Sequence, residues 1–252
     1  MKRTQTPFSK NELDRYNRQI LLPGFGKDGQ KKLKSAKVTV AGAGGLGCPA
    51  SLYLAAAGIG KLTIIDKDKF ELSNLNRQVL GWQRDIGCSK AEVVAEKLRA
   101  LNPEIEVHSL VVEISEENIG ELLCDTDILV DALDNWKTRF IINAECVKRE
   151  IPIIHAGVSG LYGQIMTIIP GKTPCLLCLL PETPEEVSNF PILGVTPAIF
   201  ASLQVLETIK LIVGFGETLT RKMLLFDLES MRFTIIPVEK NPECPICAHL
   251  HK

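Results

Sequence analysis

The sequence predicts an α/β fold in which a mainly parallel, Rossmann-like sheet carries helices on both faces. Short apolar runs alternate with segments of helical periodicity up to about residue 156. A glycine-rich turn follows the first of these runs, as in nucleotide-binding βαβ units. Beyond residue 157 the runs resemble antiparallel strands, and two cysteine pairs accompany them. A C-terminal antiparallel strand extension with two cysteine knuckles is therefore expected.

The expected elements follow in order. A helix is expected over 11–21, because Ser9 and Glu12 have the spacing of a capping box. The strands expected in the parallel part are 37–41, 61–65, 105–111, 127–131 and 152–156. The main helices expected between them are 49–57 and 90–101. Antiparallel strands are expected at 163–169, 222–227 and 232–238. They flank a long helix that Thr196 caps, that Pro197 starts and that runs to about Val213.

Composition and charge exclude several classes of protein. Hydrophobic residues make up 45% and charged residues 23%, the balance of an ordinary soluble domain. A formal net charge of -1 gives no electrostatic reason to expect nucleic acid or a membrane as partner. The amino end has no apolar signal segment, and we expect no apolar run of the roughly 18 residues that a membrane span needs. A cytoplasmic location is expected.

The glycine-rich turn lies in VTVAGAGGLG, residues 38–47. Gly42, Gly44 and Gly47 fit the G-x-G-x-x-G pattern between a strand and a helix. Glycines let the backbone approach phosphate, and the helix N-terminus offers free N–H groups. Asp66 ends the second strand, where an acidic side chain can bond ribose hydroxyls. The pattern predicts a nucleotide site but does not say which nucleotide, so an NAD-dependent oxidoreductase remains an alternative.

Downstream charged and polar residues have no use in hydride transfer. IIDKDKFELSNLNRQ, GCSK and DALDNWKTR supply Asp66, Asp68, Asn74, Arg77, Lys90, Asp134 and Arg139. Asp134 follows a predicted strand at the carboxyl edge of the sheet, where a carboxylate suits Mg²⁺ beside phosphates. Arg77 and Lys90 suit phosphate charge. Together these residues suit contacts with nucleotide phosphates, whereas hydride transfer gives them no role.

Four of the eight cysteines form two CxxC pairs, Cys175–Cys178 and Cys244–Cys247. Disulfides are unusual in a reducing compartment, so metal binding is the first interpretation. Four thiolates suit a structural, tetrahedral Zn²⁺, whereas four reduced or redox-active thiols are the alternative.

Taken together, these motifs resemble the MoeB/ThiF/HesA family of E1-like enzymes, which activate sulfur carriers for molybdopterin and thiamine synthesis. The likeness rests on RYNRQ, GAGGLG, the DKD and SNLNRQ segments, Lys90, LDN and the paired CxxC, from about Arg15 to Cys247. In pattern it is closest to the molybdopterin-synthase adenylyltransferases. It implies ATP-dependent adenylation of the C-terminal glycine carboxylate of a ubiquitin-like, MoaD- or ThiS-type sulfur carrier, with pyrophosphate released.

The resemblance also implies roles for residues of this chain. The residues implied to bind the nucleotide are Gly42, Gly44, Gly45, Gly47, Asp66, Asp68, Asn74, Arg77, Lys90 and Asp134. The implied catalytic residues are Arg18, Arg77, Lys90 and Asp134. Arg18 and Lys90 would contact phosphates and Asp134 would hold Mg²⁺. Arg77 would come from the second subunit of a homodimer. ATP, Mg²⁺ and a structural Zn²⁺ are the implied cofactors.

The implied organisation is a single adenylation domain over 1–252. It has N-terminal helices in 1–35, a nucleotide-binding core in 36–156, and a carrier-binding and zinc-knuckle region in 157–252. The implied partners are a ubiquitin-like sulfur carrier, a sulfur donor such as a persulfide-carrying protein, and a second copy of the chain. A non-catalytic E1-like binding subunit is a further alternative, which the intact charged set disfavours.

Two expectations concern groups that the chemistry does not need. A protein C-terminus is already ionised at neutral pH, so no general base is required and His155 is expected to be a hydrogen-bonded structural residue. The segment 179–197 contains no cysteine, so the adenylate is expected to pass directly to an external sulfur donor. Cys48 is expected to pack behind the glycine turn, and Cys88 is the stronger alternative nucleophile.

Overall fold

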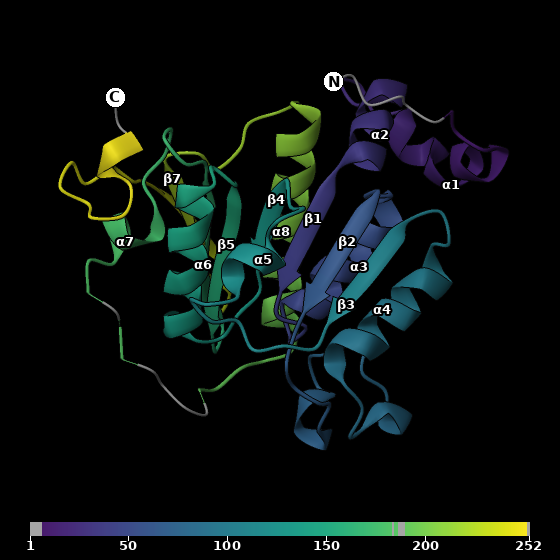
Figure 1. Ribbon diagram of the computed structural model, residues 1–252, viewed down its shortest axis with the longest axis horizontal. Helices are drawn as coiled ribbons and strands as arrows, with labels where there is room; N and C mark the ends of the chain where they lie inside the picture. The colour runs from purple at the N-terminus through teal and green to yellow at the C-terminus, as the bar shows by residue number, and fades with distance from the viewer. Residues whose placement is uncertain (1–6, 183, 186–189, 251–252) are drawn as a thin grey trace.

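The structure, a computed structural model, describes residues 7–250 apart from 183 and 186–189 (Figure 1). Within these residues one eight-stranded sheet has the order β3-β2-β1-β4-β5-β6-β7-β8. Strands β3, β2, β1, β4 and β5 are parallel. Strands β6, β7 and β8 extend the sheet in antiparallel pairs. The mainly parallel sheet with an antiparallel C-terminal extension is confirmed.

The structure gives the elements the following bounds. The strands are β1 (Lys37–Ala41), β2 (Lys61–Ile65), β3 (Glu106–Leu110), β4 (Ile128–Asp131), β5 (Ile153–Ser159), β6 (Tyr162–Ile168), β7 (Lys222–Asp227) and β8 (Arg232–Pro237). The helices are α1 (Lys10–Ile20), α2 (Gly26–Ser35), α3 (Gly47–Ala57), α4 (Lys90–Leu101), α5 (Ile119–Leu122), α6 (Trp136–Lys148), α7 (Leu176–Leu179) and α8 (Val195–Val213). Short 3₁₀ turns lie at Leu72–Asn74, Gln83–Asp85 and Ala248–Leu250.

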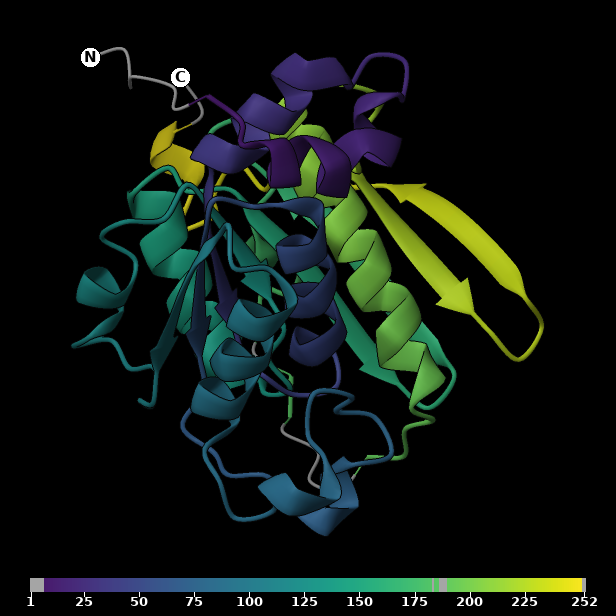
Figure 2. The same cartoon turned by 90° about the vertical axis from the view of Figure 1, so that its right-hand side faces the viewer.

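Strand β5 runs three residues further than the sequence predicted, to Ser159. It pairs with β6 along its full length, from Ile153 opposite Ile168 to Ser159 opposite Tyr162. A tight hairpin therefore joins the parallel and antiparallel parts, and the expected boundary near residue 157 falls inside a strand. Figure 2 shows the last hairpin, β7 and β8, reaching outward beside α8.

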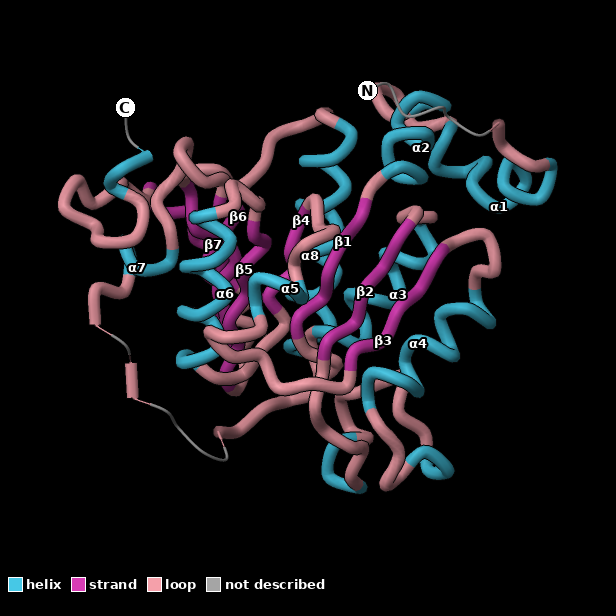
Figure 3. Tube along the Cα trace, viewed as in Figure 1, coloured by secondary structure: helices cyan, strands magenta, loops and turns pink. Residues whose placement is uncertain are grey.

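Helices cover both faces of the sheet (Figure 3). Helices α2, α3, α4 and α8 contribute to one apolar core, and α5, α6 and α7 to a second. The pleat of the strands supplies both cores, because successive side chains point to opposite faces. Leu129 of β4 belongs to the core beneath α6, and the next residue, Val130, to the core beneath α8.

The N-terminal helices pack at the amino ends of the strands. The predicted capping box is present: Ser9 Oγ accepts the Glu12 N–H at 3.0 Å, and the Glu12 carboxylate accepts the Ser9 N–H at 2.8 Å. Tyr16 of α1 accepts a hydrogen bond from Asn102, which precedes β3. In Figure 1, α1 and α2 lie at the top, and the segment 66–89 that follows β2 lies at the bottom. The two ends of the sheet are thus separated by the length of the strands.

Helix α8 differs from the expectation at its start. It begins at Val195, its N-cap is Gly194, and Thr196 lies inside the first turn. The Thr196 hydroxyl donates to the Gly160 carbonyl at 2.9 Å, which ties the helix to the β5–β6 turn instead of capping it. Thr196 as a cap was therefore wrong, because a tertiary contact takes its hydroxyl.

By length and a mean hydropathy of 1.4, α8 is the one described helix that could cross a membrane, contrary to our expectation from the sequence. In the structure it packs against α3, β5 and β6. It also buries polar side chains, which are paired with groups inside the protein. Among them, Gln204 donates to the Asp131 and Ile154 carbonyls of β4 and β5. A helix facing lipid would find no such partners on its outer surface. These contacts are those of a core helix.

The close approach of β6 to α8 generates a stability prediction. A Cβ at Gly163 would overlap the ring of Phe200, which is fully buried. Gly163→Ala should therefore lower the free energy of unfolding by about 1–3 kcal/mol, the usual cost of overpacking a core. Urea unfolding measures it. Gly157→Ala on the facing strand is the control, because its nearest neighbours would lie at 3.5 Å or beyond. Equal stability of the two variants would contradict the packing described.

Candidate active site

A cavity of about 1770 Å³ opens at the carboxyl edge of the sheet. The loops that follow β1, β2 and β4 form one wall, and residues of β5, β6 and β7 form another. Strands β1 and β4 are neighbours although β2 and β3 lie between them in sequence. Strands β2 and β3 are added on one side of β1, and β4 on the other, so the strand order reverses at this point. Ligands of open α/β sheets bind at such a switch point. The cavity exceeds the roughly 300–1,000 Å³ of most small-molecule sites, which leaves room for a nucleotide and a chain end.

The glycine turn forms the floor of the cavity between β1 and α3. Gly42 has φ +98°, a conformation that other residues rarely adopt, and a Cβ there would lie 2.6 Å from the Ala132 carbonyl oxygen. A Cβ at Gly47 would overlap the carbonyl of Gly42. The turn therefore packs against the loop after β4 with no space for side chains, and it exposes backbone N–H groups at the start of α3.

Asp66 is fixed against this turn. Its Oδ2 accepts the Ala43 N–H at 2.7 Å, and its Oδ1 accepts the Asp68 N–H at 2.8 Å. Burial raises the pKa of Asp66, and these two N–H groups counteract the rise. The carboxylate thus lies at the place where the motif predicts a ribose contact.

Lys90 lies at the first position of α4, where it is nearly buried. Its ammonium is 3.1 Å from the Asp68 carboxylate, and its N–H donates to the Asp68 carbonyl at 2.9 Å. Both side chains line the cavity. Asp68 therefore holds the Lys90 charge in the cavity wall, where an entering phosphate would compete for it.

Arg77 lines the cavity of its own chain, and its supply by a second subunit stays a prediction that subunit mixing tests. A Cβ at Gly45 would lie 3.3 Å from the Arg77 side chain, and one at Gly194 would overlap the Asn76 carbonyl. The segment after Asp68 turns back toward the sheet, because a bridge joins Lys69 to Ser89 and a 3₁₀ turn closes around residue 74. The sequence did not reveal this return.

Three of the expected site residues do not line the cavity: Arg18, Gly47 and Asn74. Gly47 serves the geometry of the turn. Asn74 is buried, and its side-chain oxygen accepts the Glu71 N–H at 3.0 Å, so it organises the loop that carries Arg77. Arg18 is exposed on α1, at the opposite end of the sheet.

Asp134 lies in the cavity wall on the loop between β4 and α6. Its neighbour Asn135, which belongs to the LDN motif but was given no role from the sequence, lines the cavity and caps α6 by accepting the Thr138 N–H at 2.9 Å. Arg139, a charged residue of the same DALDNWKTR segment that was given no role from the sequence, also lines the cavity. Among the described residues, five basic and seven acidic side chains line the cavity. A polyphosphate entering it would need a cation, which favours a divalent metal at the carboxylates.

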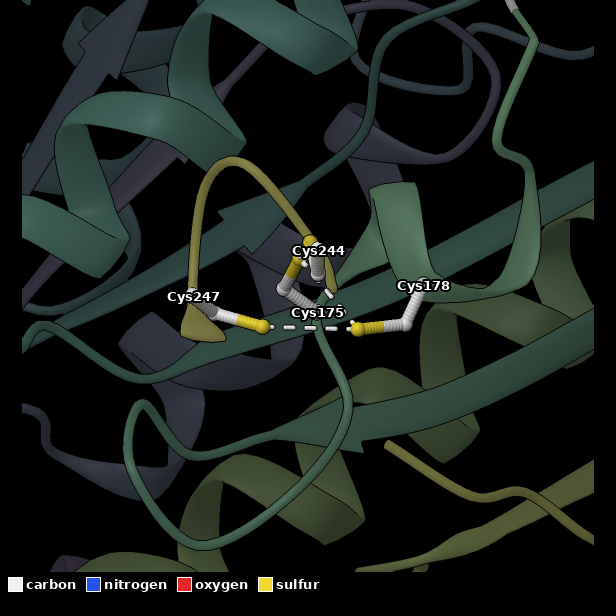
Figure 4. A group of neighbouring side chains, drawn as sticks. All are labelled: Cys175, Cys178, Cys244 and Cys247. Atoms are coloured by element: carbon white, nitrogen blue, oxygen red, sulfur yellow. Dashed lines mark hydrogen bonds between the residues drawn. The ribbon is translucent and has the colours of Figure 1, made fainter. Parts of the chain in front are cut away.

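The two cysteine pairs meet although 65 residues separate them in sequence. The Sγ atoms of Cys175, Cys178, Cys244 and Cys247 lie within 4.8 Å of one another (Figure 4). Neighbouring sulfurs are 3.3–4.0 Å apart. Zn–S bonds of about 2.3 Å at tetrahedral angles would place sulfurs about 3.8 Å apart. The donor set and its spacing therefore fit Zn²⁺.

Two cysteines weighed as nucleophiles and one histidine lie outside the lining of the cavity. Cys48 is fully buried, its thiol donates to the Ala43 carbonyl at 3.1 Å, and burial raises its pKa to about 12, which makes it a poor nucleophile. Cys88 is exposed and does not line the cavity. His155 is buried with Nδ1 2.6 Å from Asp131, as expected for a structural histidine.

Comparisons with known proteins agree with the motif resemblance. The SAMP-activating enzyme E1 of Haloferax volcanii is 40% identical over 241 residues, which cover 94% of this chain and 89% of that protein. The sulfur carrier protein adenylyltransferase of Thermus thermophilus is 39% identical over 250 residues, covering 95% and 92%. The crystal structure of E. coli MccB with ATP has a TM-score of 0.80 and 29% identity, covering 93% of this chain and 74% of that one. The ThiF family model matches residues 16–246, and the chain belongs to the ThiF family.

Proposed function

We propose that this chain is an adenylyltransferase that uses ATP to activate the C-terminal glycine carboxylate of a ubiquitin-like sulfur carrier. The observation that carries the proposal is the single cavity in which the glycine turn and Asp66 lie beside Arg77, Lys90 and Asp134. Two relatives that this chain matches over most of their length are named as a sulfur carrier protein adenylyltransferase and a SAMP-activating enzyme E1.

In the proposed reaction a carboxylate oxygen of the carrier attacks the α-phosphorus of ATP. A carboxyl–phosphate bond forms, the bond to the bridging oxygen of the β-phosphate breaks, and pyrophosphate leaves with the electron pair. Repulsion between anions opposes this step, and charge grows on the leaving group. Arg77 and Lys90 would stabilise that charge from fixed positions, which requires no proton transfer. A Mg²⁺ ion at Asp134 would neutralise phosphate charge.

Sulfur transfer would follow outside this chain. No described cysteine lines the cavity: Cys48 is buried, and Cys88 is exposed outside the lining. The proposed acyl adenylate therefore passes directly to a persulfide-carrying donor. The carrier, as the second substrate of the enzyme, would contact the cavity wall formed by β6 and β7. The exposed side chains near this wall are Tyr162, Phe233 and Ile235. The proposed location is the cytoplasm, where such thiol chemistry stays reduced.

The proposal includes a homodimer in which Arg18 serves the neighbouring copy. Arg18 is exposed, makes no hydrogen bond or ion pair with any described residue, and does not line the cavity of its own chain. Its helix α1 lies at the end of the sheet opposite the segment 66–89 (Figure 1). A phosphate contact by Arg18 would therefore require a second subunit, with α1 against the mouth of the partner's cavity.

The role of Asp134 gives the first functional prediction. Asp134→Asn should lower the rate of carrier-dependent ATP–pyrophosphate exchange by about a hundredfold, because one preorganised charged group is commonly worth that much. Asp28→Asn is the control, since that carboxylate is 88% exposed on α2. Exchange by Asp134→Asn at the rate of the unchanged protein would contradict the assignment.

The cysteine cluster gives the second functional prediction. Purified protein should contain about one zinc per chain, and Cys247→Ser should lose the metal and unfold at lower urea, because metal binding is coupled to folding. Cys124→Ser, which changes an exposed cysteine outside the cluster, should keep both properties. A metal-free protein of unchanged stability would exclude the structural zinc.

The third functional prediction distinguishes the roles of Arg18 and Arg77 by mixing subunits of two inactive variants. Arg18→Ala mixed with Asp134→Asn should recover about a quarter of the activity, because half of the dimers are mixed and each has one intact site. Arg77→Ala mixed with Asp134→Asn should recover none, since both residues line one chain's cavity. Recovery by the second pair would show that Arg77 is the shared residue.

A further inference from the structure

Both backbone polar groups of Leu133, the residue before Asp134, are held by charged side chains. The Leu133 N–H donates to Oδ1 of Asp131 at 3.2 Å. The Leu133 carbonyl accepts from Nη2 of Arg139 at 2.5 Å, and the same nitrogen donates to the Ala156 carbonyl at 2.8 Å. A loop peptide fixed at both its donor and its acceptor has little freedom to move.

This loop lies directly on the glycine turn. A Cβ at Gly42 would lie 2.6 Å from the Ala132 oxygen and 3.4 Å from the Leu133 nitrogen. Any displacement of residues 132–134 would therefore change the spacing between the turn and Asp134. Displacements of about 1 Å at such a site are costly to catalysis.

The carboxylate that anchors the loop is itself buried. Asp131 is 1% exposed, at the last position of β4. Its charge is compensated by the Leu133 N–H, by the Arg139 Nε at 3.5 Å and by His155 Nδ1 at 2.6 Å. A buried carboxylate that loses one such partner is strongly destabilised, so each partner constrains the others.

His155 links this anchor to the opposite wall of the cavity. Its Nδ1 faces Asp131, and its Nε2 faces the side-chain amide of Gln164 at 3.4 Å. The imidazole is then neutral, with Nδ1–H donating to Asp131 and Nε2 accepting from Gln164; burial, which lowers the pKa of His155, agrees. Gln164 and Arg139 both line the cavity, whereas His155 and Asp131 do not.

We propose that His155 and Asp131 are positioning residues, which act through Arg139 and the Leu133 peptide to fix Asp134 relative to the glycine turn. The consequence for catalysis rests on the proposed adenylation, but the consequence for the loop does not. A network that served stability alone would affect unfolding without affecting the loop or the turnover number.

The test compares His155→Ala with His155→Asn and with Thr167→Val. Asn offers an N–H near the position of Nδ1. Thr167 is a matched control: it is fully buried on the neighbouring strand and donates a side-chain hydrogen bond to buried Glu207 at 2.7 Å. The readouts are amide hydrogen exchange of residues 132–136, kcat and KM for ATP in pyrophosphate exchange, and stability in urea.

We expect His155→Ala to speed amide exchange in residues 132–136 and to lower kcat about tenfold to a hundredfold, the range for lost outer-shell hydrogen bonds. His155→Asn should recover part of both, and Thr167→Val should lose stability only. The proposal is overturned if His155→Ala resembles Thr167→Val, with amide exchange in 132–136 and kcat unchanged.

Should His155→Ala fail to fold, Gln164→Met replaces it, because Gln164 is only partly buried. Faster amide exchange in 132–136 then supports the proposal, and unchanged exchange overturns it. If Asp134→Asn keeps full activity, the proposed role of Asp134 fails, and hydrogen exchange alone still decides whether His155 and Asp131 hold the loop.

Discussion

The parallel pairing of β1 with β4 is the constraint on which the site depends. It sets Ala41 opposite Asp131, so the glycine turn and the loop that carries Asp134 leave the sheet side by side. The absence of a side chain at Gly42 then lets the two loops touch through their backbones. Because β2 lies on the other side of β1, Asp66 reaches the same turn and bonds the Ala43 N–H. Three chain segments thus converge on one cavity through strand order alone.

The cysteine cluster supports this edge from a distance. Cys175 and Cys244 belong to the apolar core beneath α6, and the Leu176 N–H donates to the side chain of buried Asn143 on that helix at 2.9 Å. Helix α6 begins at Trp136, immediately after the loop that carries Asp134. A zinc ion there would join the C-terminal tail to the helix whose first turn forms part of the cavity, so metal binding, folding and the site are physically connected.

Local pattern predicted much of the fold. Strands 37–41, 61–65 and 222–227 and helix 90–101 were predicted with the observed bounds, because period and turn residues agreed with tertiary packing there. The glycine turn, Asp66, Lys90, Asp134 and the cysteine cluster were identified from motifs with a chemical reason. What local pattern could not predict depended on contacts distant in sequence. The Thr196 hydroxyl bonds Gly160 instead of capping α8, Arg77 packs against Gly45, and His155, which was expected to be structural, finds its partner Asp131 only because β4 and β5 are neighbours. No local signal carries such pairings.

The protein is proposed to transfer AMP from ATP to the C-terminal carboxylate of a carrier bound at this cavity. The most direct measurement is mass spectrometry of a ubiquitin-like sulfur carrier after incubation with the purified protein, ATP and Mg²⁺. The account predicts a carrier adenylate when the terminal glycine is present, and none when that glycine is removed. A zinc-loaded, folded protein that binds ATP but adenylates no sulfur carrier, or that adenylates a carrier regardless of its terminal glycine, would contradict it.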